Sequence, residues 1–182
     1  IHLPRQLYEA LKVQKEFDSK RDQQKSFTTP LVGRRQEWQR LLSAWKHAST
    51  GSPHIIFICG EAGIGKSRLI EEVVDWAKRQ RIQSAVAHCY PIEGSLPYAP
   101  VVTWMRVLPL PVLDDLWLIE ISRLLPEVSQ SHPKLPKPGP LSEAWQRQRL
   151  FEALARGILT QKRQLLLVIE DLQWCDRDTL EW

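Results

Sequence analysis

The stretch that decides the fold runs from Ile55 to Ser67 and reads Ile-Ile-Phe-Ile-Cys-Gly-Glu-Ala-Gly-Ile-Gly-Lys-Ser. Its first five residues are apolar and mostly β-branched, which predicts a strand buried on both faces, as in a parallel sheet. After the glycine-rich turn, Lys66–Gln80 alternates apolar and charged residues at helical spacing. Ile82–Cys89 has the pattern of a second strand. Strand, helix and strand with short joints predict a right-handed βαβ unit.

The turn itself has a chemical signature. Its residues match the pattern G-x-x-x-x-G-K-[S/T] of a phosphate-binding loop, or Walker A motif: Gly60, Glu61, Ala62, Gly63, Ile64, Gly65, Lys66 and Ser67. The glycines permit unusual backbone conformations and let main-chain N–H groups approach phosphate oxygens. We expect the Lys66 ammonium on the β- and γ-phosphates and the Ser67 hydroxyl on Mg²⁺. A chance match is the alternative, but the flanking strand and helix favour nucleotide binding.

A pair of acids, Glu170-Asp171, ends the apolar run Leu165–Ile169, which predicts another buried strand. In phosphate-loop proteins a carboxylate at such a strand end holds Mg²⁺, usually through water, and a neighbouring one can polarise the attacking water. If the strand continues, the two side chains point to opposite faces and serve different roles. Lys66, Glu170 and Asp171 are therefore the candidate catalytic residues, with Ser67 and Glu170 as the candidate metal partners.

The remaining sequence predicts helices and one irregular region. Residues 3–17 have near-helical apolar spacing and lead into a polar linker at 18–29. Residues 38–48 form a single apolar stripe typical of an amphipathic helix. Residues 91–140 hold ten of the thirteen prolines, and we expect an irregular surface insertion in which 112–125 can still be helical. Ser142 is expected to cap a long helix that reaches about Gln161.

Composition excludes several other classes of protein. The chain has 182 residues, 43% of them hydrophobic, and a net charge of +4, which is ordinary for a globular protein. No apolar run approaches the ~18 residues of a membrane span, so we expect no membrane partner. Three scattered cysteines (Cys59, Cys89 and Cys175) predict neither a disulfide framework nor a zinc site, and we expect free thiols in the cytoplasm.

Four stretches together resemble one family. Leu31–Glu37 (LVGRRQE) is similar to the VGR-x-x-E box of AAA-type ATPases and of the signal-transduction ATPases with numerous domains (STAND). Gly60–Leu69, Arg147–Leu154 and Leu166–Asp176 (LLVIEDLQWCD, with the Walker B acids) resemble three further stretches in the same order. The resemblance implies an α/β P-loop NTPase fold, with a parallel sheet flanked by helices in three layers, whose N-terminal part spans residues 30–182.

The resemblance also implies roles for individual residues. Gly33 and Arg34 would lie by the adenine and ribose of ATP, although Arg34 is equally suited to a surface ion pair. Arg68 belongs to the loop stretch, and Glu170 matches the Mg²⁺-associated acid. Because this sequence has Glu-Asp where many relatives have Asp-Glu, the roles of Glu170 and Asp171 stay open. We expect Asp176 to cap the next helix rather than to act on the nucleotide.

Within this family the stretches resemble the ATPase modules of large ATP-binding LuxR-type transcriptional regulators, and residues 1–29 resemble the last helix of a bacterial transcriptional activator domain. This implies a nucleotide switch with DNA bound by other domains and with self-association. By the same resemblance a later strand lies between the loop strand and the acid strand. We expect it, with the sensor and lid, beyond Trp182, so the segment alone should hydrolyse ATP poorly. The alternatives are a cyclase- or kinase-linked signalling protein and a DNA-handling AAA ATPase.

Overall fold

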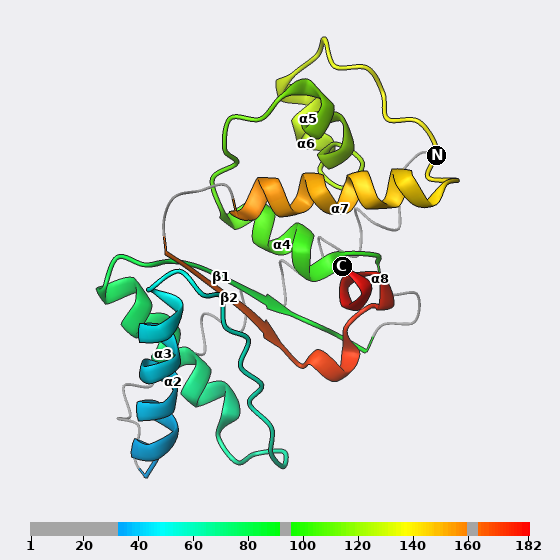
Figure 1. Cartoon of the computed structure of the whole chain (residues 1–182). Helices are drawn as coiled ribbons and strands as arrows, with labels where there is room; N and C mark the ends of the chain where they lie inside the picture. Colours follow the sequence, from blue (N-terminus) through cyan, green and yellow to red (C-terminus); the bar gives the residue numbers. More distant parts are fainter. Residues whose placement is uncertain (1–32, 92–95, 160–163) are drawn as a thin grey trace.

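A parallel pair of strands forms the sheet in the computed structural model, which describes residues 33–91, 96–159 and 164–182. β1 (Gln83–His88) pairs with β2 (Leu165–Glu170), in a register that runs from Gln83 beside Leu165 to His88 beside Glu170. Both strands were predicted at these places, and the architecture is α/β (Figure 1). The predicted helix at 3–17, the linker at 18–29 and Leu31-Val32 lie outside the described residues.

The first two helices of the described chain pack against each other. α2 (Arg35–Ala48) and α3 (Lys66–Arg79) confirm the predicted amphipathic helices. They pack through indole rings, because Trp38 and Trp45 of α2 meet the ring of Trp76 edge-on at centroid distances of 6.4 and 5.8 Å. α3 contacts both β1 and β2. The glycine-rich turn is thereby attached, through the helix it opens, to one face of the sheet.

The proline-rich region 91–140 is not the irregular surface insertion that its composition predicts. It folds into α4 (Ala99–Val107), α5 (Asp115–Ile121) and α6 (Pro126–Ser131). Its prolines do not prevent this, because they lie in the first turn of α4 and α6, where a missing N–H costs nothing, or outside the helices. Of the expected helix at 112–125, only α5 forms as such. The stretch from His132 to Pro140 has no helix, as predicted.

α7 (Ala144–Leu159) covers these insertion helices and closes the main core. After β2 the chain continues through a short 3₁₀ turn, η1 (Leu172–Trp174), into α8 (Arg177–Glu181). The predicted cap at Ser142 is wrong: α7 begins two residues later, and the Ser142 hydroxyl donates to Gln146 Oε1 at 3.3 Å. That same oxygen also accepts the backbone N–H groups of Ser142 and Glu143, so a glutamine side chain does the capping.

The main core lies between one face of the sheet and the helices α4, α5 and α7. Its fully buried members include Ala85 and Ala87 of β1, and Leu165, Leu167 and Ile169 of β2 pack against it. Because side chains alternate along a strand, the other residues of each strand face the opposite side. α3 lies on that opposite side (Figure 1). The sheet therefore separates a large helical core from the face that carries the phosphate-loop helix.

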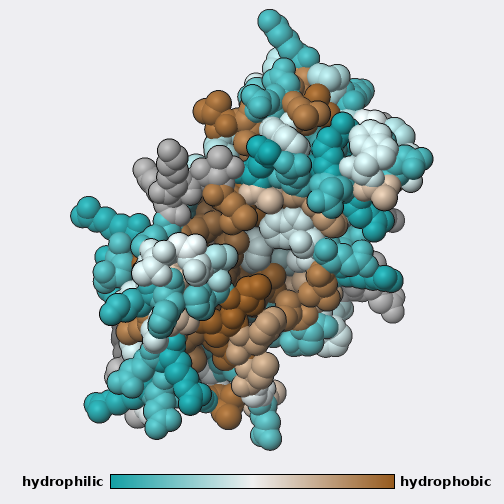
Figure 2. All heavy atoms as spheres, in the orientation of Figure 1, coloured by the Kyte–Doolittle hydropathy of each residue, from teal (hydrophilic) through white to brown (hydrophobic). Residues whose placement is uncertain are grey.

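The predicted buried strand at Ile55–Cys59 is the clearest error of the sequence interpretation. These residues are in no strand, and the side chains of Ile55, Ile56 and Phe57 are 85%, 48% and 70% exposed. Figure 2 shows hydrophobic atoms gathered in a band across this side of the molecule. A strand needs a neighbouring backbone, and among the described residues β2 pairs with β1 alone. β2 itself is half-buried over most of its length rather than strongly buried.

Without the strand at 55–59, the predicted βαβ unit does not form from these three segments. The parallel connection that the structure does contain runs instead from β1 to β2 through α4, α5, α6 and α7. None of the described helices is long and apolar enough to cross a membrane.

Candidate functional site

The turn between Gly60 and Ser67 has a backbone that requires glycine. Gly63 and Gly65 have φ angles of +78° and +93°, in the left-handed region that side chains disfavour. Gly65 is also the N-cap of α3, and the first helical bond joins Leu69 N to Gly65 O at 3.1 Å. The N–H groups of the first turn of α3 have no partner within the helix and point out of its end. A loop of this shape at a helix N-terminus suits an anion.

The Lys66 side chain lies over the loop that precedes it. Its ammonium donates to the carbonyl oxygens of Gly60 and Glu61, both at 2.9 Å. The positive charge is therefore held at the loop. Ser67 follows in the first turn of α3, half-buried, and Glu61 and Ala62 are exposed on the loop.

Arg34 joins the start of α2 to the loop. Its guanidinium donates to Glu37 Oε1 at 2.8 Å and to the backbone carbonyl of Ile64. A backbone hydrogen bond and the Arg34 guanidinium lower the pKa of Glu37. Gly33, with a φ of +80°, turns the chain immediately before. Arg34 thus makes the predicted ion pair and also lies beside the loop, and its place by the adenine and ribose stays a prediction.

The two acids occupy different environments. Glu170 is the last residue of β2 and is 4% exposed, whereas Asp171 is exposed and adopts a left-handed conformation with φ +58°. The strand ends at Glu170, so the expected alternation of the two side chains along a continuing strand does not apply. The Gln173 side chain donates to Asp171 Oδ1 at 3.4 Å. Of the two carboxylates, only Glu170 is held inside the fold.

Arg68 is placed differently from the other residues of the loop stretch. It pairs with Glu71 at 3.5 Å and Glu72 at 3.3 Å, one turn further along α3. These ion pairs hold the Arg68 side chain against α3 itself. The structure thus brings Arg34 and Lys66 to the loop, and puts Glu170 on the sheet against which the loop helix packs.

Asp176 confirms its predicted role as a helix cap and has a second role that the sequence did not indicate. Its Oδ1 accepts the N–H of Thr179 at 2.8 Å, and its Oδ2 accepts the Thr179 hydroxyl at 2.7 Å. Oδ1 also accepts the N–H of Tyr98 at 2.9 Å, across 78 positions of sequence. This buried carboxylate joins the start of α8 to the start of α4. Only knowledge of the fold could have revealed the contact with Tyr98.

Two of the scattered cysteines meet in the fold. Cys89 follows β1, Cys175 follows η1, and the two thiols lie close enough to influence each other's pKa. All three cysteines are free, as predicted. Burial raises the pKa of Cys89 to about 12, and burial also raises the pKa of Cys175. The thiols next to the acidic turn are therefore protonated and weakly nucleophilic.

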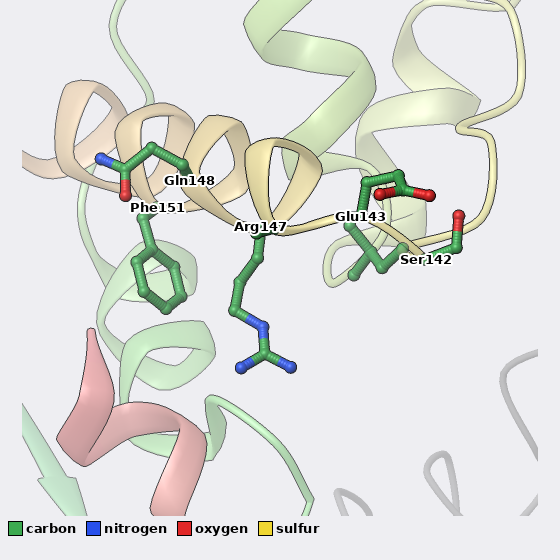
Figure 3. A pocket seen from close by; sticks show the side chains of 7 residues that line it. Ser142, Glu143, Arg147, Gln148 and Phe151 are labelled. Atoms are coloured by element: carbon green, nitrogen blue, oxygen red, sulfur yellow. The ribbon is translucent and has the colours of Figure 1, made fainter.

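A shallow cavity of about 340 Å³ lies at the start of α7 and is shown in Figure 3. Its lining includes Ser142, Glu143, Arg147 and Phe151. Arg147 extends toward α8, where it lies 3.5 Å from Glu181. This cavity involves none of the predicted site residues. Within the described ranges, no group of three or more His, Cys, Asp or Glu residues is arranged to hold a metal ion.

The comparison with known families decides the wider interpretation. The sequence model described as the AAA ATPase domain matches residues 30–182. The chain belongs to this family. No match was found among the curated proteins or among the solved structures. As an AAA ATPase domain the chain is a nucleotide-binding ATPase module of the P-loop NTPase type, and such domains generally bind ATP with Mg²⁺.

The residues of this AAA domain fit that pair of ligands. The left-handed glycines leave room for an anion beside main-chain N–H groups, and Lys66 supplies a positive charge at the same place. The hydroxyl of Ser67 and the carboxylate of Glu170 are oxygen donors of the kind that Mg²⁺ prefers. Bound Mg²⁺ would neutralise charge on the phosphates, and the residues named here would orient it.

Proposed function

We propose that the chain is the switch module of an ATP-dependent regulator, in which ATP·Mg²⁺ binds at the loop Gly60–Ser67 and slow hydrolysis or exchange resets the conformation. The observation that carries the proposal is the loop itself. Lys66 is held by the carbonyl oxygens of Gly60 and Glu61 at the N-terminus of α3, and Arg34 reaches the loop from the start of α2. The sequence resemblance to LuxR-type regulators supports the further proposal that DNA is bound by other domains.

Each candidate residue has a proposed part. The loop N–H groups and Lys66 bind the phosphates, and Ser67 and Glu170 hold Mg²⁺, Glu170 through water. Asp171, which is exposed at the end of the turn, is free of the packing that fixes Glu170 and is suited to orient a water molecule. Gly33 and Arg34 would lie at the nucleoside end. We further propose a cytoplasmic location and self-association of the full-length protein.

The contact between Arg34 and Ile64 gives the switch a physical basis. A ligand shifts a conformational equilibrium only through contacts that differ between two states. The Ile64 carbonyl lies in the loop and accepts a hydrogen bond from the guanidinium of Arg34, which is the N-cap of α2. Filling the loop with phosphates would therefore act on α2 through Arg34.

The experiment compares DNA binding and ATP turnover of the full-length protein with ATP and with ADP. A regulator switch predicts that DNA affinity differs between the two nucleotides and that Lys66→Ala removes the difference. Glu170→Gln and Asp171→Asn should lower turnover. Turnover that is strongly stimulated by DNA would instead indicate a DNA-handling ATPase. If neither acid variant alters turnover, the assignment of the acids is wrong.

A further inference from the structure

His88 lies beside Glu170 at the end of the sheet. The two residues are register partners in the last pair of the parallel ladder. Side chains that are paired in this way share one face of a sheet. That face is the one opposite the Ala85 and Ala87 core, and α3 packs on it. The imidazole therefore lies on the same face of the sheet as the helix that begins at the phosphate loop.

The imidazole lies close to the carboxylate. His88 Nδ1 lies 3.6 Å from Glu170 Oε1, and the two side chains are 12% and 4% exposed. The backbone is tied at the same point, because Cys89 N donates to Glu170 O at 3.0 Å. On its other side the His88 ring lies 6.4 Å from the ring of Tyr90. Both the main chain and the side chain of Glu170 are thus held by the end of β1.

The preceding register pair on this face of the sheet has no charged side chain, so the contact between His88 and Glu170 is confined to the end of the ladder. Val86 beside Val168 is wholly apolar, and the ladder becomes charged only at His88 and Glu170. A carboxylate with so little exposure has few orientations open to it, and a neighbouring ring nitrogen that carries a proton selects one of them. Asp171, on the exposed turn, lacks this restraint.

We propose that His88 is a positioning residue that holds the Glu170 carboxylate in the orientation needed for the Mg²⁺ of bound ATP. The inference rests on the proposed function of the loop and deepens it. When His88 Nδ1 fixes Oε1 of Glu170, the orientation of the other carboxylate oxygen is fixed as well. The gain in ATP affinity that Mg²⁺ gives therefore depends on His88 of the neighbouring strand. Nucleotide binding without metal does not depend on it.

The test measures the affinity of a fluorescent ATP analogue with Mg²⁺ and with EDTA. His88→Phe keeps a ring of similar size and removes both nitrogens, and it should lower the gain from Mg²⁺ by about tenfold, the usual cost of losing a partner of a metal-site residue. Affinity in EDTA should stay within about twofold of wild type, because the phosphate contacts of the loop are intact. His88→Asn, whose amide nitrogen replaces Nδ1, should retain the gain. His132→Phe, an exposed histidine after α6, is the matched control.

The outcomes separate this inference from the proposal on which it rests. An unchanged gain from Mg²⁺ in His88→Phe overturns the positioning role while nucleotide binding stands. No binding by the wild-type chain in either condition overturns the proposed function, and the positioning role with it. If His88→Phe does not fold, His88→Gln replaces it, since its amide nitrogen does not reach the Nδ1 position. Equal gains in the Asn and Gln variants would also contradict the inference.

Discussion

At the scale of single residues, charge placement distinguishes the groups that serve the site from those that hold the fold. Lys66 and Arg34 direct their charges at backbone carbonyls of an exposed loop, where an anionic ligand can compete for them. Asp176 and Glu120 are buried, and each has one partner nearby in sequence and one in another part of the fold. The first kind of contact can be exchanged on binding, whereas the second stabilises the chain itself.

Replacing Asp176 with alanine tests the second kind. The change removes the cap of α8 and leaves the buried Tyr98 N–H without its acceptor, so we expect a loss of about 3 kcal/mol in the free energy of unfolding. Urea denaturation gives the value. Asp114→Ala is the matched control, because Asp114 is the N-cap of α5 but makes no side-chain capping bond, and it should cost less than about 0.5 kcal/mol. Equal losses in both variants would contradict the assignment.

Cys89 gives a prediction about pH. Burial raises its pKa to about 12, well above the usual range of a cysteine thiol. A group whose pKa is higher in the folded state favours folding below its unfolded pKa, and this contribution disappears as the pH rises through the folded value. We therefore expect part of the stability to be lost between about pH 9 and pH 12, and less of it in Cys89→Ala. At pH 8 a thiol reagent should modify exposed Cys59 long before Cys89; equal rates would refute the burial of Cys89.

The residues of the site were found from sequence to different extents. The loop, Lys66 and the acids have motif spacing, and Asp176 precedes a helical pattern, so local chemistry was enough to predict them. His88, with its proposed positioning role, and Tyr98 have no such signal, because their contacts depend on which strand lies beside β2 and which helix begins near α8. Contacts between residues far apart in sequence depend on the topology of the fold, and a single sequence carries little information about topology.

At the scale of elements, a buried ionic cluster joins α5 to α7. Glu120 is fully buried, with Arg123 Nε 2.5 Å from its Oε2 and Arg149 Nη2 2.7 Å from its Oε1. Arg149 also lies 4.9 Å above the ring of Trp145. Two cations around one carboxylate hold the insertion helices against the long helix that covers them.

Glu120→Ala should lower the free energy of unfolding by about 3–5 kcal/mol, because it leaves two arginines without their shared partner inside the fold. The comparison is Glu127→Ala, which breaks a half-exposed pair with Arg106 and should cost at most about 1 kcal/mol. Chemical denaturation of both variants decides the matter. Losses of similar size would mean that the cluster around Glu120 is solvated in solution.

Helices and strands were predicted correctly where their pattern is local, and wrongly where they depend on distant parts of the chain. The helices α2 and α3 follow from apolar spacing alone. The insertion was misjudged because prolines were counted without regard to their positions in the helical turns. The run at Ile55–Cys59 has the composition of a strand, but composition does not provide the neighbouring backbone that makes one.

At the scale of the whole molecule, the core lies away from the apolar stretch Ile55–Cys59. Leu150, Leu154 and Ile158 of α7 are almost fully buried, whereas Phe57 is 70% exposed. We therefore expect Phe57→Ser to change the free energy of unfolding by less than about 0.5 kcal/mol, and Leu154→Ala to cost about 2–5 kcal/mol. Thermal or urea unfolding compares the two. A large loss for Phe57→Ser would show that residues 55–59 are packed in solution.

The exposed apolar band also bears on how the domain behaves as a unit. Contiguous apolar surface of this kind is uncommon on a monomer and favours contact with other protein surface. A hydrophobic dye such as ANS should therefore bind the chain at residues 55–57, and Phe57→Ser should weaken its fluorescence. Conversely, dye fluorescence that is insensitive to this substitution would place the accessible apolar surface elsewhere.

The central claim, that the loop Gly60–Ser67 binds ATP with Mg²⁺, is tested most directly by calorimetric titration of the chain with ATP in the presence of Mg²⁺. The account predicts one site per chain and a loss of affinity of at least about tenfold in Lys66→Ala, because a charge-assisted contact to phosphate is removed. Lys78→Ala, on the same helix but exposed and paired with Asp75, should bind as wild type does. Wild-type affinity in Lys66→Ala would contradict the claim.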